Sequence, residues 1–144
     1  MKSLGVFEKT EQKTAHWIES VAHNMGSTDM ERSYHVLRSV LHAVRDRLPG
    51  DEAVHLGAQM PMLVRGFYYE GWRPSATPER YRHKQDFLDH IAHDVPSLDP
   101  AQRERAATAV FTVLDQELRG GETSQVRNAM PEEVRDLWPS AESG

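Results

Sequence analysis

The stretch VLRSVLHAVRDRLPG, residues 36–50, decides the fold of this 144-residue chain. Its apolar residues recur at helical spacing, at Val36, Leu37, Val40, Leu41, Val44 and Leu48. A stripe at this spacing predicts an amphipathic helix that buries one face. Gly50 follows the stripe and predicts the end of that helix, because glycine tolerates the left-handed backbone of a helix C-cap.

The same pattern returns seventy residues later in AATAVFTVLDQELRG, residues 106–120. The two halves align without a gap and keep one apolar phase, as when Trp17 and Val21 meet Phe87 and Ile91. The identical pairs are Ala22-His23 with Ala92-His93, Ser27 with Ser97, Asp29 with Asp99, Val40 with Val110, Leu48 with Leu118, Gly50 with Gly120, Glu52 with Glu122, Met60-Pro61 with Met130-Pro131, and Val64-Arg65 with Val134-Arg135. The sequence therefore predicts an internal repeat.

Each repeat reads as four helices, and strand periodicity is nearly absent. A cap containing Asp29 or Asp99 is expected to open the second helix of each unit, and the fourth helix is predicted from about Met62 to Tyr69 and from about Glu132 to Trp138. We predict an all-α fold of eight helices, arranged as two tandem pseudo-symmetric four-helix units. The repeats span residues 11–72 and 81–140, joined by a turn-rich linker at 73–80. A unit of about 60 residues buries only a marginal core by itself, so we expect both units to pack into one compact domain over residues 1–144.

Composition excludes several classes of function. The chain has no cysteine, which rules out disulfides, thiolate catalysis and cysteine-ligated zinc. Its net charge is −5, so it lacks the surplus of Lys and Arg that argues for nucleic-acid binding. The apolar stretch at residues 4–7 is too short for a signal-peptide core, and no run of about eighteen apolar residues occurs. We therefore expect a cytoplasmic protein with no membrane association.

The chain carries a family resemblance over roughly residues 12–140, most distinctively in the segment 42–74 with the helix end that precedes it. The residues concerned are Leu41, Leu48, Glu52, Leu56, Gln59, Pro61, Arg65 and the run Tyr68-Tyr69-Glu70-Gly71-Trp72 in the first half, and Leu118, Gly120, Glu122, Met130, Pro131, Arg135 and Trp138 in the second. Through them the chain resembles a bacterial family catalogued as domain of unknown function 2267. The resemblance implies a helical bacterial protein, and it implies no activity, substrate or cofactor.

Glu52 and Arg65 recur in the second half as Glu122 and Arg135. A carboxylate and a guanidinium retained together favour structural ion pairs that tie the third helix of each unit to the fourth. A duplicated anion site is the alternative. We favour the structural interpretation, because chemistry rarely needs two copies of one site inside a small chain.

The aromatic segment after Arg65 breaks the repeat, since the second half has Asp136-Leu137-Trp138-Pro139 in its place. Tyr and Trp offer large rigid surfaces with a polar tip, a composition favoured at interfaces. A partner-binding face is therefore predicted from Arg65, Tyr68, Tyr69, Trp72 and Arg73. The alternative is that these aromatic rings fill the seam between the two units.

Histidine is frequent, with eight residues in the chain. Asp86 and His90 are spaced i, i+4, and His90 and His93 are spaced i, i+3, so the three can share one helix face. That face would offer three N/O ligands to zinc, nickel or iron. The competing interpretation is that His93 complements a helix C-terminus and that His90, which matches Ser20 in the first half, has no repeated role.

The segment 73–84 is locally basic and could contact phosphate. Its single acid, Glu79, stands against Arg73, Arg80, Arg82, His83 and Lys84. No nucleophile elbow, P-loop or dinucleotide fingerprint occurs. We therefore predict no catalytic residue and no cofactor. The sequence favours a non-enzymatic interaction module that binds a protein partner or forms a homodimer. A metal-binding protein or metalloenzyme using the Asp/His face is the first alternative, and a DNA-associated protein using the basic segment is the second.

Overall fold

The computed structural model describes residues 4–119 and 121–139, and within them the chain is helical without strands. The elements are α1 (Gly5–Met25), α2 (Met30–Arg47), α3 (Gly50–Ala58), α4 (Met62–Tyr69), the 3-10 helix η1 (Pro74–Ala76), α5 (Lys84–Asp94), α6 (Pro100–Glu117), α7 (Glu122–Ala129) and α8 (Glu132–Arg135). The predicted all-α class with eight helices is confirmed. Gly120 and residue 140, the predicted end of the second repeat, lie outside the described residues.

The order of these elements matches the sequence repeat. Helix α6 begins and ends seventy residues after α2, and α8 begins seventy residues after α4. The fourth helices differ in length, because α8 ends at Arg135 although the sequence predicted a helix to Trp138. The arrangement is compatible with two tandem units.

Several helix ends are set by local chemistry that the sequence displays. The predicted glycine cap of α2 is wrong, because α2 ends at an extended Leu48 and Gly50 begins α3. The Asp29 carboxylate accepts a hydrogen bond from the Arg32 backbone N–H at 2.9 Å and caps α2. Asp99 caps α6 in the same way, and the Gln102 side chain accepts the Asp99 backbone N–H in return. Gly26 closes α1 with φ 67°, a left-handed conformation that favours glycine.

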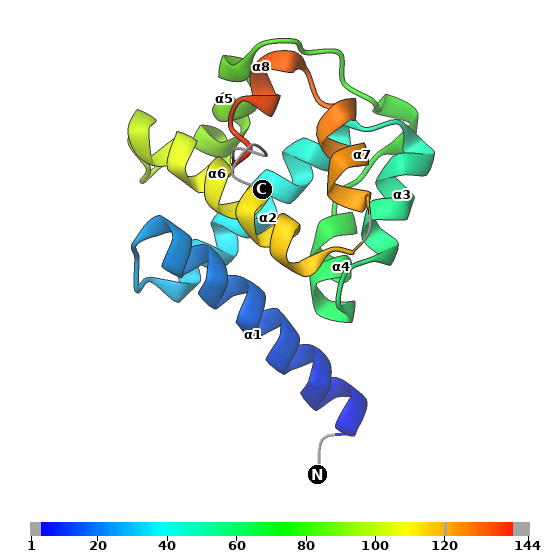
Figure 1. The fold of residues 1–144 in the computed structure, drawn as a ribbon, viewed down its shortest axis with the longest axis vertical. Coiled ribbons are helices and arrows are strands. Elements are labelled where there is room, and N and C mark those ends of the chain that lie inside the picture. Colours follow the sequence, from blue (N-terminus) through cyan, green and yellow to red (C-terminus); the bar gives the residue numbers. More distant parts are fainter. Residues whose placement is uncertain (1–3, 120, 140–144) are drawn as a thin grey trace.

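The long helices α2 and α6 cross at the centre of the fold, with α1 packed against both (Figure 1). Helices α3, α4 and α7 lie together on one side, and α5 packs against α8. One hydrophobic cluster joins side chains of both halves, among them Leu41, Phe87 and Phe111. The ring of Phe111 stacks on Trp138 at a centroid distance of 3.8 Å.

The N-terminal end of α1 extends beyond the remaining helices (Figure 1). Its inward-facing residues Thr10, Thr14 and Trp17 are buried, whereas Phe7, one turn earlier, is exposed. None of the described helices combines the length and the apolarity needed to cross a bilayer.

Candidate functional site

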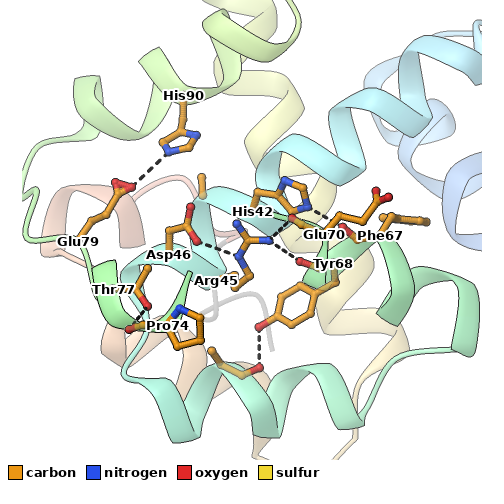
Figure 2. Close-up of polar contacts among 12 residues, drawn as sticks. His42, Arg45, Asp46, Phe67, Tyr68, Glu70, Pro74, Thr77, Glu79 and His90 are labelled. Carbon is orange, nitrogen blue, oxygen red and sulfur yellow. Dashed lines mark hydrogen bonds and ion pairs between the residues drawn. The ribbon is translucent and has the colours of Figure 1, made fainter. Parts of the chain in front are cut away.

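The C-terminal end of α4 is fixed to α2 by a buried arginine (Figure 2). Arg45, only 3% exposed, donates from Nη1 to the carbonyl oxygens of Tyr68 and Glu70 at 2.7 and 2.8 Å. Its Nε donates to Oδ1 of Asp46 at 2.8 Å. The aromatic segment is therefore held through its backbone, which determines which of its side chains face outward.

His42 binds the same end of α4. Its Nε2 lies 2.6 Å from the carbonyl oxygen of Phe67, and a carbonyl only accepts, so the ring donates from Nε2. Burial lowers the pKa of His42 below its usual 6.5; the hydrogen bond to Phe67 opposes that shift, and the charge of Arg45 adds to it. The neutral ring is favoured, which suits a structural donor.

The predicted partner-binding residues do not form one surface. Tyr68 is fully buried and its hydroxyl donates to the Ala53 carbonyl at 2.6 Å. Burial raises the pKa of Tyr68 well above its usual value of 10, and the neighbouring Tyr69 adds to that shift. Tyr69 and Trp72 are partly buried, with ring centroids 5.6 Å apart, and Arg73 is exposed. Tyr68 thus belongs to the core, as the alternative interpretation held for the whole segment.

Arg65 is not paired with Glu52. Within residues 4–119 and 121–139, its guanidinium donates to carbonyl oxygens, from Nε to Gly57 at 3.1 Å and from Nη2 to Met60 at 2.9 Å. Gly57 lies in the last turn of α3 and Met60 lies two residues after that helix, where few intrahelical donors remain for the carbonyls. Arg65 therefore ties α4 to α3 through the backbone of α3.

Arg135 has the equivalent role in the second half and is not paired with Glu122 in the described part of the chain. It donates from Nε to the Met130 carbonyl at 3.0 Å and from Nη2 to the Asn128 carbonyl at 3.2 Å. The repeat has thus kept an arginine that closes the third helix of each unit. The expected carboxylate partner is replaced by main-chain acceptors, which need no charge to accept from a guanidinium.

The two repeated glutamates meet each other instead. Glu52 lies in the first turn of α3 and Glu122 in the first turn of α7, and these two helices are neighbours (Figure 1). His55 lies one turn after Glu52, and its Nδ1 is 3.4 Å from Oε2 of Glu122. Burial raises the pKa of the Glu122 carboxyl, His55 opposes this and Glu52 adds to it. Glu52, His55 and Glu122 each place one potential ligand atom near a common point, with these atoms within 4.8 Å of one another.

The predicted metal face on α5 is not assembled. Asp86 accepts the His83 backbone N–H at 3.4 Å as part of the α5 N-cap, and His93 contacts Asp94 at 3.3 Å. His90 faces Glu79, with 3.4 Å between Nε2 and Oε1. Among the described residues, the groups of ligating atoms close enough to share an ion do not include this trio.

His90 instead joins a different cluster, with Glu79 and Asp46 (Figure 2). In this cluster Asp46 already accepts from the Arg45 guanidinium at 2.8 Å, so its charge is compensated. A cation would compete with Arg45 for that carboxylate. This cluster helps to hold the linker against α2, because the Glu79 backbone N–H also donates to the Asp46 carbonyl.

The basic segment is partly neutralised by acids. His83 Nδ1 lies 3.1 Å from Oε2 of Glu133, and Lys84 Nζ lies 3.6 Å from Oε1 of Glu104. The contacts to the Lys84 backbone and to His83 lower the pKa of Glu133. Arg80 is exposed, but the mixed charge around it does not favour binding to phosphate.

Sequence reasoning missed the convergence of Glu52, His55 and Glu122. A signal was present, because Glu52 and His55 form a Glu-x-x-His spacing that places both side chains on one helix face. The second half keeps the glutamate and has Gln125 at the histidine position. What the sequence did not contain was the proximity of α3 and α7, which are far apart along the chain.

These observations define an all-helical class of protein whose sequence carries an internal repeat. A family model described as "Uncharacterized conserved protein (DUF2267)" matches residues 14–137. The chain belongs to that family, as its resemblance over segment 42–74 implied. A search of curated proteins finds no match.

Proposed function

We propose that this protein is a non-catalytic interaction module that pairs with a second copy of itself. The observation that carries the proposal is an apolar end face built from the first turn of α1 and the start of α4. Five of the seven exposed large apolar side chains of the described residues lie there: Leu4, Val6, Phe7, Met62 and Leu63. Such a cluster marks a binding surface more often than a free surface.

The two parts of the end face are held side by side. The Leu63 backbone N–H donates to the Thr10 hydroxyl at 3.2 Å, which joins α4 to α1. Phe7, Met62 and Leu63 are 46%, 46% and 45% exposed. The N-terminal end of α1 extends past the body of the protein (Figure 1), and its apolar residues Leu4, Val6 and Phe7 are exposed.

Charge around the end face favours a second copy as the occupant. The exposed residues beside it on α1 are Glu8, Lys9, Glu11 and Lys13, which carry both signs. A two-fold contact must be complementary to itself. If two α1 ends cross antiparallel, the lysines of one copy approach the glutamates of the other.

The proposed surface lies at the start of α4 and not in the aromatic segment at its end. Tyr69 and Trp72 are partly buried against the core, so they could contribute only the edges of their rings to a binding surface. A groove of about 460 Å³ begins where the end face stops, at Gln12 and Pro61, and has room for side chains of the partner copy.

The experiment measures molar mass by light scattering after size exclusion, from micromolar concentrations upward. Wild type is expected as a dimer, and Leu63→Glu as a folded monomer, since the charge would be buried at the interface. Val54→Glu is the matched control, because Val54 is also exposed, at 49%, but lies on α3 outside the end face. A wild type that stays monomeric at every concentration, or a Val54→Glu variant that dissociates equally, contradicts the proposal.

A further inference from the structure

We propose that Glu52, His55 and Glu122 bind one divalent transition-metal ion between α3 and α7. The site is independent of the end face and of the predicted histidine face on α5. The metal would join one residue pair of the first half to one residue of the second.

The geometry provides the first argument. One ligating atom from each of the three side chains lies within 4.8 Å of the others. Bonds of about 2.0–2.2 Å to nitrogen and oxygen place tetrahedral ligands about 3.3 Å apart. His55 Nδ1 and Glu122 Oε2 already stand at 3.4 Å, so small side-chain rotations complete the set.

The second argument is the state of the carboxylates. Glu122 is 6% exposed, and its Oε1 is buried without a hydrogen-bond donor among the described residues. Oε1 of Glu52 is buried without a donor in the same part of the chain. Buried polar atoms nearly always have partners, and two neighbouring carboxylates repel each other. A cation held between the two carboxylates compensates their charge and removes the repulsion.

A purely structural role for the two glutamates accounts for less of this geometry. Position in a first helical turn favours a negative charge, but a capping carboxylate would accept backbone N–H groups at the unpartnered oxygens. The repeated arginines are occupied with main-chain carbonyls, as described for Arg65 and Arg135. His55 approaches only one oxygen of Glu122, which leaves Oε1 of Glu122 and Oε1 of Glu52 unsatisfied within the described residues.

The donor set indicates the class of ion. One imidazole with two carboxylates suits Zn²⁺, Mn²⁺, Fe²⁺ or Co²⁺, whereas Mg²⁺ and Ca²⁺ prefer oxygen ligands alone. The His55 side chain is 52% exposed, so the site opens to solvent on that side. A fourth position is therefore accessible to water or a small anion. Because the ligands come from both α3 and α7, the bound ion would cross-link the two repeats.

The test uses untagged protein freed of metal with a chelator that is then removed. Titration calorimetry with Zn²⁺ is expected to give one ion per chain, and a hundredfold excess over Kd should raise Tm by roughly 5 °C or more. Co²⁺ should give the visible absorption of a tetrahedral or five-coordinate site. Glu122→Gln keeps the shape and removes the charge, so we expect at least about a tenfold loss of affinity.

Two matched variants separate this site from adventitious histidine binding. His90→Gln disables the Asp46–Glu79–His90 cluster, and His83→Gln removes an exposed His–Glu contact of similar length. Both should bind Zn²⁺ as wild type does. Metal-free Glu122→Gln should remain folded by circular dichroism with a Tm no lower than that of metal-free wild type. Absence of binding at millimolar Zn²⁺, unchanged affinity in Glu122→Gln, or loss of binding in His90→Gln overturns the proposal.

Discussion

At one pair of equivalent positions, the two halves join their long central helix to the segment at or just after the fourth helix with opposite polarity. In the first half, Arg45 of α2 donates to the carbonyl of Tyr68 at 2.7 Å. In the second half, Asp115 of α6 occupies the place of Arg45 and accepts from the indole Nε1 of Trp138 at 3.0 Å. The repeat has therefore kept the join between elements and exchanged the chemistry that makes it.

The two joins also differ in the number of groups that each side chain contacts. Arg45 contacts a second carbonyl, that of Glu70, and the Asp46 carboxylate. The hydrogen bond of Asp115 is made to one side chain. A buried donor that satisfies several acceptors is costly to remove, because each acceptor is left unpaired. The first half should therefore depend more strongly on its polar join than the second.

The largest expected effect follows from that difference. Arg45→Leu should lower the free energy of unfolding by about 3 kcal/mol, since two carbonyls and a carboxylate lose their partner. Asp115→Leu should cost about 1 kcal/mol or less, because only the indole N–H of Trp138 loses its partner. Urea unfolding followed by circular dichroism compares the two. Equal losses of unfolding free energy in the two variants would contradict the proposed difference between the joins.

A smaller effect should be the same in both halves. Arg65→Lys and Arg135→Lys should each cost about 1 kcal/mol, because an ammonium group cannot reproduce the two-pronged contact with the carbonyls of α3 or α7. The exposed linker residue Arg80 supplies the control, and Arg80→Lys should change the free energy of unfolding by less than about 0.5 kcal/mol. Clearly unequal costs at positions 65 and 135 would contradict an equivalent role.

Much of the fold was predictable because it is local. The apolar spacing at residues 36–48 defines α2, Asp29 and Asp99 mark helix starts, and α4 has the predicted bounds Met62–Tyr69. A repeat strengthens such patterns, since the same periodicity must suit two helices. The end of α8 at Arg135 was not predicted, and Trp138 beyond it stacks on Phe111, a contact between distant residues that no local pattern records.

The candidate sites were less predictable because they depend on contacts between distant elements. Glu52 and Arg65 recur together in the repeat, yet recurrence does not state which atoms meet. The guanidinium turns to nearby carbonyls, and the carboxylate faces α7. Spacing on α5 suggested a metal face, but Asp86 is used as a cap and His90 faces the linker.

The smallest effect is the pH dependence that His42 of the first half contributes. His42 has its pKa lowered in the folded protein, chiefly by burial, whereas Thr112 at the equivalent position does not titrate. Below pH 6.5 the unfolded chain binds the proton more readily than the folded one. The stability that neutral His42 contributes is therefore fully present above pH 6.5 and is lost as the pH falls toward the lowered pKa.

Unfolding of wild type and His42→Gln between pH 5 and 8 isolates this contribution, because the other histidines are common to both proteins. The wild-type curve should fall more steeply below pH 6.5 than the variant curve. Parallel curves would show that His42 has the same proton affinity in the folded and unfolded chain.

The most direct measurement is a pair of double-mutant cycles on the metal-free protein at pH 7, using Glu52→Gln with Glu122→Gln and Glu52→Gln with Arg65→Lys. If the repeated glutamates face each other, the first cycle gives a coupling of at least about 0.5 kcal/mol. The second cycle should then be additive within about 0.5 kcal/mol, because Arg65 bonds to carbonyls. Strong coupling of Glu52 to Arg65, with none to Glu122, would contradict this arrangement of the two halves.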